Sequence, residues 1–88
     1  MAPDAPEVLY TAAMVSYLSK DYSRALRNIR RAIAREPENP GYLYHSAVIE
    51  TASGDSDAAI ETLEQLASLE QDFPEREQAI ALLGRLKH

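Results

Sequence analysis

Few side chains in this sequence combine a reactive type with a spacing that catalysis or metal binding would use. The two histidines, His45 and His88, share no ligand spacing with each other or with carboxylates. Ser46 directly follows His45, but adjacent residues on a helix point about 100° apart, so they form no serine–histidine relay. The glycines occur singly and form no phosphate-binding loop. We therefore expect no enzyme activity, no cofactor and no metal site.

Length and composition predict one small domain. A chain of 88 residues with 45% hydrophobic and 26% charged residues is typical of a globular protein. The absence of cysteine excludes disulfides and thiolate metal sites. No apolar run approaches the roughly 18 residues of a membrane span, and residues 1–4 do not resemble a signal peptide. We expect a cytoplasmic chain, or a periplasmic one if it is a fragment of an exported protein.

The helix that would organise such a domain lies between Asp21 and Pro40. Its apolar residues recur at i, i+4, i+7 and i+8 and so share one helical face: Ala25, Ile29, Ala32 and Ile33. Asp21 is a suitable N-cap, and Glu36-Pro37 ends the helix because a residue before proline is disfavoured in helical geometry.

A period of 34 residues relates this helix to the rest of the chain. Pro6, Pro40 and Pro74 follow one another at that interval. The same shift superimposes small and apolar residues: Leu9 on Leu43, Ala13 on Ala47 and Ala81, Val15 on Ile49 and Leu83, and Ala25 on Ala59. A fixed period of this length indicates a stacked two-helix unit.

Capping residues and turns in the same register predict five antiparallel helices in an all-α fold. We expect Asp4, Asp21, Asn39 and Asp55 to cap the first four, with Glu7 completing a capping box, and Gly54 to close the third. The expected helices are Ala5 to Ser19, Tyr22 to Glu36, Pro40 to Ser53, Ser56 to Glu70, and Pro74 to Gly84 or the tail.

This helix-turn-helix pattern resembles the tetratricopeptide repeat. The resemblance assigns residues 6–39 to repeat one, 40–73 to repeat two and 74–88 to a capping helix, so that 1–88 form a single domain of an α-solenoid. The motif places in repeat one hold Leu9, Ala12, Ala13, Ser16, Ala25, Ile29, Ala32 and Pro37. Those in repeat two hold Leu43, Ser46, Ala47, Glu50, Ala59, Leu63, Leu66 and Gln71.

The resemblance implies small-residue packing between the two helices of a repeat, and it exposes one departure. Ala13 should pack opposite Ala25, because larger side chains would hold the helices apart. The family's tyrosine place is occupied by Ser16 and Glu50. We expect the Glu50 carboxylate to reach solvent; the alternative is a partly buried carboxylate with a raised pKa.

The resemblance also implies that the first helix of each repeat lines a concave, protein-binding surface. Carried over by position, the predicted surface is Tyr10, Met14, Tyr17, Leu18, Tyr44, Val48, Thr51, Gln78 and Leu82. Its apolar character favours a groove for an apolar or amphipathic helix of a partner protein. The alternative is that these residues fill space inside a bundle too shallow for a groove. Tyr10, Met14 and His45 replace residues of the family's carboxylate clamp, which argues against a carboxylate-clamp cochaperone.

Val8 and Val15 predict an open N-terminal edge. Their counterparts Tyr42 and Ile49 should pack on residues 22–36, yet no repeat precedes residue 6. A second copy of the chain, another protein, or the upstream repeats of a larger scaffold would cover this edge. Alternatively, the valines are two singly exposed residues without a role.

Six of the nine basic residues lie in or beside residues 22–36: Lys20, Arg24, Arg27, Arg30, Arg31 and Arg35. A basic helix can bind nucleic acid or anionic lipid. However, the net charge is −5, and Asp57, Glu61 and Glu64 recur at repeat places near Arg27 and Arg30. We interpret the basic residues as a solvated face that pairs with these carboxylates, and we expect no nucleic-acid partner.

Overall fold

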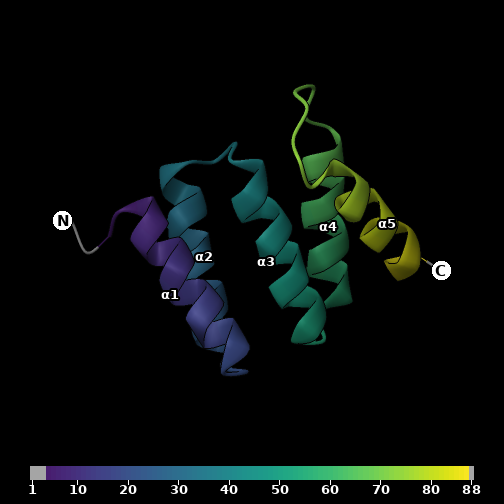
Figure 1. Cartoon of the computed structure of the whole chain (residues 1–88). Coiled ribbons are helices and arrows are strands. Elements are labelled where there is room, and N and C mark those ends of the chain that lie inside the picture. Colours follow the sequence, from purple (N-terminus) through teal and green to yellow (C-terminus); the bar gives the residue numbers. More distant parts are fainter. Residues whose placement is uncertain (1–3, 88) are drawn as a thin grey trace.

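Five consecutive helices run through residues 4–87, which are the residues that the computed structural model describes. They are α1 (Pro6–Leu18), α2 (Tyr22–Arg35), α3 (Pro40–Ala52), α4 (Ser56–Ala67) and α5 (Arg76–Leu86). Successive helices pack side by side in a row, from α1 and α2 at one end to α5 at the other (Figure 1). No helix in this range has the length and hydrophobicity that a membrane span requires.

Local side-chain chemistry starts three of the helices, as predicted. The carboxylates of Asp21 and Asp55 accept hydrogen bonds from the third backbone N–H downstream, at 3.2 and 3.1 Å. Asn39 does the same for α3, whose first helical residue is Pro40. Each cap satisfies a backbone donor that the helix itself leaves free.

The predicted cap of α1 is wrong. Ala5 occupies the N-cap position, and no side chain caps the helix there, so Asp4 and Glu7 form no capping box. The Asp4 carboxylate instead lies 3.1 Å from the guanidinium of Arg35 at the far end of α2. A partner distant in the sequence therefore replaces the local one.

The turns after α1 and α3 have the same hydrogen bonds 34 residues apart. Asp21 N–H donates to the Ser16 carbonyl at 2.8 Å, and Asp55 N–H donates to the Glu50 carbonyl at 2.9 Å. Such a turn needs a left-handed residue just before the donor. Gly54 takes this conformation with φ of 90°, as predicted, and Lys20 takes it in the first turn with φ of 63°.

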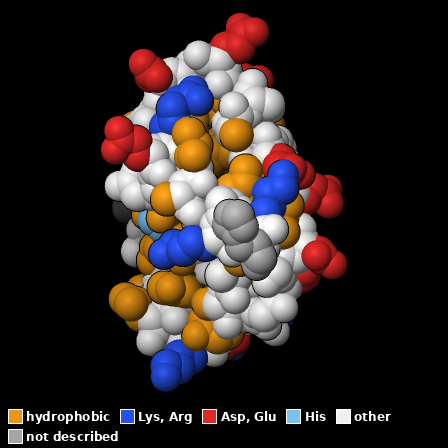
Figure 2. All heavy atoms as spheres, turned by 90° about the vertical axis from the view of Figure 1, so that its right-hand side faces the viewer, with side chains coloured by type: hydrophobic (Ala, Val, Ile, Leu, Met, Phe, Trp, Pro, Cys, Tyr) orange, Lys and Arg blue, Asp and Glu red, His pale blue; other side chains and the backbone are white. Residues whose placement is uncertain are grey.

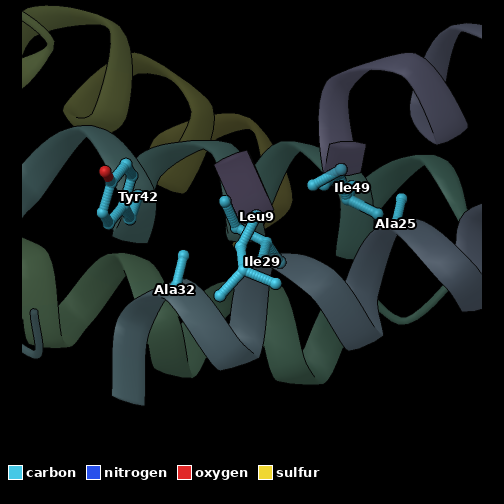
Figure 3. Close-up of a cluster of buried hydrophobic side chains, with 7 residues drawn as sticks. Leu9, Ala25, Ile29, Ala32, Tyr42 and Ile49 are labelled. Carbon is cyan, nitrogen blue, oxygen red and sulfur yellow. The ribbon is translucent and has the colours of Figure 1, made fainter. Parts of the chain in front are cut away.

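The first hydrophobic core joins α1, α2 and α3. Ala13 and Ala25 are both fully buried in it, which agrees with the small-residue packing expected between the helices of a pair. Tyr42 and Ile49 of α3 belong to the same core, and Figure 3 shows them beside the helix that carries Ile29. The prediction that these two residues pack on α2 is confirmed.

The second core joins α3, α4 and α5, and here the period fails. The prediction that Pro74 begins the last helix is wrong, because α5 begins at Arg76. The prediction that α4 reaches Glu70 is also wrong, because α4 ends at Ala67. Phe73 is buried in this core, and on α5 Ala79 and Leu82 are buried while Ala81 is exposed.

Arg76 gives the physical reason for the altered start of α5. Its guanidinium donates to the carbonyls of Leu69 and Gln71 at 3.0 and 2.7 Å, and it lies 4.8 Å from the centre of the Phe73 ring. These contacts tie down the segment between α4 and α5 as a loop. The helix therefore begins after the loop, with a different face against α4.

Candidate functional site

A pocket of about 280 Å³ opens between the C-terminal parts of α1 and α3 and the side of α5. Its lining residues come from all three helices: Tyr17, Tyr44, Val48, Thr51, Ala52, Leu82 and Arg85. Five of them, Tyr17, Tyr44, Val48, Thr51 and Leu82, belong to the surface predicted from the sequence. We call this pocket the concave groove.

Helical spacing on two elements builds the concave groove. Tyr44, Val48 and Thr51 stand at i, i+4 and i+7 on α3 and so share one face. Leu82 and Arg85 are three residues apart on α5. The Thr51 hydroxyl donates to the Ala47 carbonyl of its own helix at 2.8 Å. The lining is therefore mainly apolar and aromatic, with Arg85 as its one charged group.

The remaining residues of the predicted surface lie outside this pocket. Tyr10 and Met14 pack against the first core, and Leu18 is 79% exposed at the end of α1. The Tyr10 ring stacks on Tyr42 at 5.4 Å between centres. Gln78 is exposed on α5. The structure therefore divides the predicted surface into residues that line the groove and residues that do not, and Tyr17, Tyr44 and Val48 of the groove also pack against the cores.

His45 makes two polar contacts, and its ring also lies edge-on to the rings of Tyr10 and Tyr44. Its Nδ1 lies 2.8 Å from the Gly41 carbonyl, one helical turn earlier. Its Nε2 lies 3.5 Å from the Tyr10 hydroxyl. Within residues 4–87, no group of three or more His, Cys, Asp or Glu side chains could hold a metal ion. The half-buried imidazole thus connects α3 to α1.

The prediction that Glu50 reaches solvent is wrong. The residue is 4% exposed, and its carboxylate accepts a 2.9 Å hydrogen bond from Thr62 on α4 and lies 3.6 Å from the guanidinium of Arg30 on α2. Burial raises the pKa of this carboxyl, while Thr62 and Arg30 oppose the rise. Ser16, at the equivalent place of the first helix pair, is also buried. That position is therefore interior in both pairs.

The N-terminal edge carries a second hollow. Glu7, Val8, Thr11 and Ala12 of α1 line a shallow cavity of about 480 Å³. Val15 is 59% exposed, whereas Ile49, its counterpart 34 residues later, is fully buried against α2. The difference arises because the described chain has no helix that covers α1 in the way that α2 covers α3.

A wider cavity of about 580 Å³ lies at the α2–α3 loop, where residues 36–40 line it. All of its walls come from five consecutive residues, so no second element closes it. We therefore assign it no ligand.

The prediction that basic residues of α2 pair with acidic residues of α4 is wrong. Arg30 pairs with Glu50, and Glu64 pairs with Lys87 of α5 at 3.0 Å. Within residues 4–87 no ion pair joins Arg27 to α4.

Figure 2 shows the end of the molecule that carries α5, where hydrophobic side chains gather at the lower left with Lys or Arg beside them.

Comparison with known protein families gives a match to most of the chain. A family model described as "Tetratricopeptide repeat" matches residues 16–86, which include the last three residues of α1 and all of α2 to α5. No protein in the curated collection matches the chain.

Proposed function

Because the chain belongs to the tetratricopeptide repeat family, we propose that it is an interaction module that binds an apolar or amphipathic helix of a partner protein in the concave groove. Repeats of this family generally mediate protein–protein interaction, often as scaffolds, and are typically not catalytic. The observation that carries the proposal is the convergence of apolar and aromatic residues from α1, α3 and α5 on one pocket.

The chemistry of the groove suits a protein ligand. Tyr17 and Tyr44 offer large, rigid contact surfaces that lose little conformational entropy on binding. Val48 and Leu82 add apolar side chains to the same lining. A volume of about 280 Å³ lies at the lower limit of small-molecule pockets, which span roughly 300–1,000 Å³. It is suited to one or two anchoring side chains of a longer helix.

The proposal is tested with a displayed library of helical peptides. Peptides enriched on the wild-type protein should bind at least about tenfold more weakly to Tyr44→Ala, because anchor residues at the centre of an interface each contribute on that scale. Ile80→Ala is the control, since Ile80 is 53% exposed on α5 and does not line the groove. Circular dichroism should show that both variants remain helical.

Two outcomes would contradict this proposal. Either the library yields no peptide that binds the wild-type protein, or the enriched peptides bind Tyr44→Ala and the wild type equally well. The second outcome would place the binding surface elsewhere on the molecule.

A second candidate function is self-assembly through the N-terminal edge, favoured by the exposure of Val15 and the hollow lined by Val8. A second copy of the chain would bury this edge and form a homo-oligomer. If the chain is the C-terminal part of a larger repeat scaffold, a preceding helix would cover it instead. Light scattering over a range of concentrations separates an oligomer from a monomer.

A further inference from the structure

Arg85 is the one charged side chain that lines the concave groove. We propose that the groove selects partner helices that carry an aspartate or glutamate about one turn from their apolar anchor, and that Arg85 binds this carboxylate. The inference rests on the proposed function, because it concerns the occupant of the same groove. It adds a charge requirement to a site whose other lining residues would accept any apolar helix.

The guanidinium of Arg85 has no carboxylate partner within the described residues, unlike the other basic side chains of α5 and its end. Arg76 lies 3.5 Å from Asp72 and also donates to two loop carbonyls. Lys87 lies 3.0 Å from Glu64. Residues 4–87 place no acidic oxygen within ion-pair distance of Arg85. Its charge is therefore available to a ligand.

The helix ends near the groove carry partial negative charge, but they do not cancel the positive charge of Arg85. The C-terminal carbonyls of α1 and α3 point toward this end of the molecule and would repel an anion. Several of them already accept backbone hydrogen bonds, such as those from Lys20 to Tyr17 and from Gly54 to Thr51 at 3.0 and 3.1 Å. A guanidinium carries a full charge and binds carboxylates with two parallel N–H groups, so it dominates at contact distance.

The placement of Arg85 also sets the spacing that a ligand needs. Leu82 and Arg85 lie on adjacent turns of one face of α5, so an apolar contact and an ionic contact stand side by side. A partner helix that places an apolar anchor against Leu82 and Val48 presents its i+3 or i+4 residue to the neighbouring turn. A carboxylate at that place satisfies Arg85, whereas a lysine or arginine is repelled.

The test uses parallel selections from one displayed library of helical peptides, with the wild type, Arg85→Glu and Arg27→Glu as targets. Arg27→Glu is the control, because it changes the net charge by the same amount as Arg85→Glu. Arg27 is exposed on α2 and does not line the groove. We expect the wild type and Arg27→Glu to enrich Asp or Glu three or four residues from an apolar anchor. Arg85→Glu should instead enrich Lys or Arg there.

Fluorescence anisotropy with one enriched peptide measures the size of the effect. Changing its acidic residue to the neutral amide should weaken binding to the wild type by about threefold to tenfold, and should not weaken binding to Arg85→Glu. Replacing aspartate with asparagine or glutamate with glutamine keeps the shape of the side chain on the peptide, so the loss reports the charge contact.

The outcomes distinguish this inference from the proposed function. If the enriched peptides need Tyr44 for binding but show no preference for an acidic residue, the role of Arg85 is overturned and the groove remains the binding site. The same conclusion follows if the preference for an acidic residue persists in the selection on Arg85→Glu. Peptides that bind without dependence on Tyr44 contradict the groove itself, and the inference fails with it.

Discussion

Thr62 on α4 donates a 2.9 Å hydrogen bond to the carboxylate of Glu50 on α3. The other oxygen of that carboxylate lies 3.6 Å from Arg30 on α2. One buried side chain therefore contacts both the helix that precedes α3 and the helix that follows it. Because α3 also lines the concave groove, these contacts help to fix the orientation of the groove wall against the rest of the fold.

The first prediction concerns pH and Glu50. Burial raises the pKa of this carboxyl in the folded chain, so its contribution to stability is fully present below the ordinary carboxyl pKa. That contribution is lost as pH rises through the folded-state pKa, because the unfolded chain ionises at a lower pH than the folded chain does. Glu50→Gln should therefore gain stability relative to the wild type as pH rises from about 4 to about 7.

Urea denaturation at the two pH values measures this difference in the free energy of unfolding. Glu50→Ala is the contrasting variant: it should change with pH relative to the wild type as Glu50→Gln does, because it also lacks the carboxyl, but it should be about 2 kcal/mol less stable than Glu50→Gln at either pH, since it leaves Thr62 and Arg30 without an acceptor. A difference between Glu50→Gln and the wild type that stays constant with pH would contradict the assignment.

The second prediction concerns the two left-handed turn residues. Lys20 has φ of 63°, a conformation that disfavours side chains, while Gly54 takes φ of 90° at the equivalent place. Lys20→Gly should stabilise the fold by up to about 1 kcal/mol, and Gly54→Ala should destabilise it by about the same amount. Nothing lies within 4 Å of a Cβ built on Gly54, so the cost would be conformational rather than steric. Thermal denaturation that ranks the variants in the opposite order would refute this explanation.

The third prediction compares two isoleucines. Ile29 is fully buried among α1, α2 and α3, whereas Ile80 is 53% exposed on α5. Ile29→Ala should lower the free energy of unfolding by about 2–5 kcal/mol, because it leaves a cavity in the first core. Ile80→Ala should change it by less than about 0.5 kcal/mol. Equal losses in chemical denaturation would show that the first core is not packed as described.

The fourth prediction tests self-assembly at the N-terminal edge. Val15→Asp should reduce any oligomer to monomers in light scattering, because it places a charge in the contact. Ile80→Asp is the matched control, since Ile80 has a similar exposure at the opposite end of the row of helices (Figure 1). A wild-type chain that is strictly monomeric at high concentration would exclude self-assembly, and dissociation by both variants alike would exclude the N-terminal edge as its specific contact.

Much of the fold was predictable because it depends on local signals repeated at a fixed interval. Asp21, Asn39 and Asp55 cap their helices through atoms within three residues. The burial of Tyr42 and Ile49 against α2 follows from stacking one helix pair on the next. Both kinds of information are present in the order of the residues.

The features that the sequence did not predict depend on partners distant along the chain. Asp4 pairs with Arg35, 31 residues away, instead of capping α1. Arg76 anchors the loop before α5 through the Leu69 carbonyl, so the period of the prolines does not set the helix start. The hydrogen bond to Glu50 comes from Thr62, which no repeat signal indicates.

The candidate site was predictable in part, because some of its residues occupy positions that the 34-residue period defines. Tyr17, Tyr44 and Val48 occupy places that the repeat pattern defines, and the structure brings them together. Arg85 was not predicted, because α5 does not follow the period of the earlier helices. Its position three residues after Leu82 was the available signal, since that spacing places both side chains on one helical face.

Backbone amide NMR of the labelled protein, titrated with a peptide enriched on the wild type, tests the binding site most directly. The account predicts that the largest shift changes occur at the groove residues Tyr17, Tyr44, Val48, Thr51 and Leu82. Residues on the outer face of α2, such as Arg27, should shift little. Changes that concentrate on α2 and α4 and spare the groove would contradict the account.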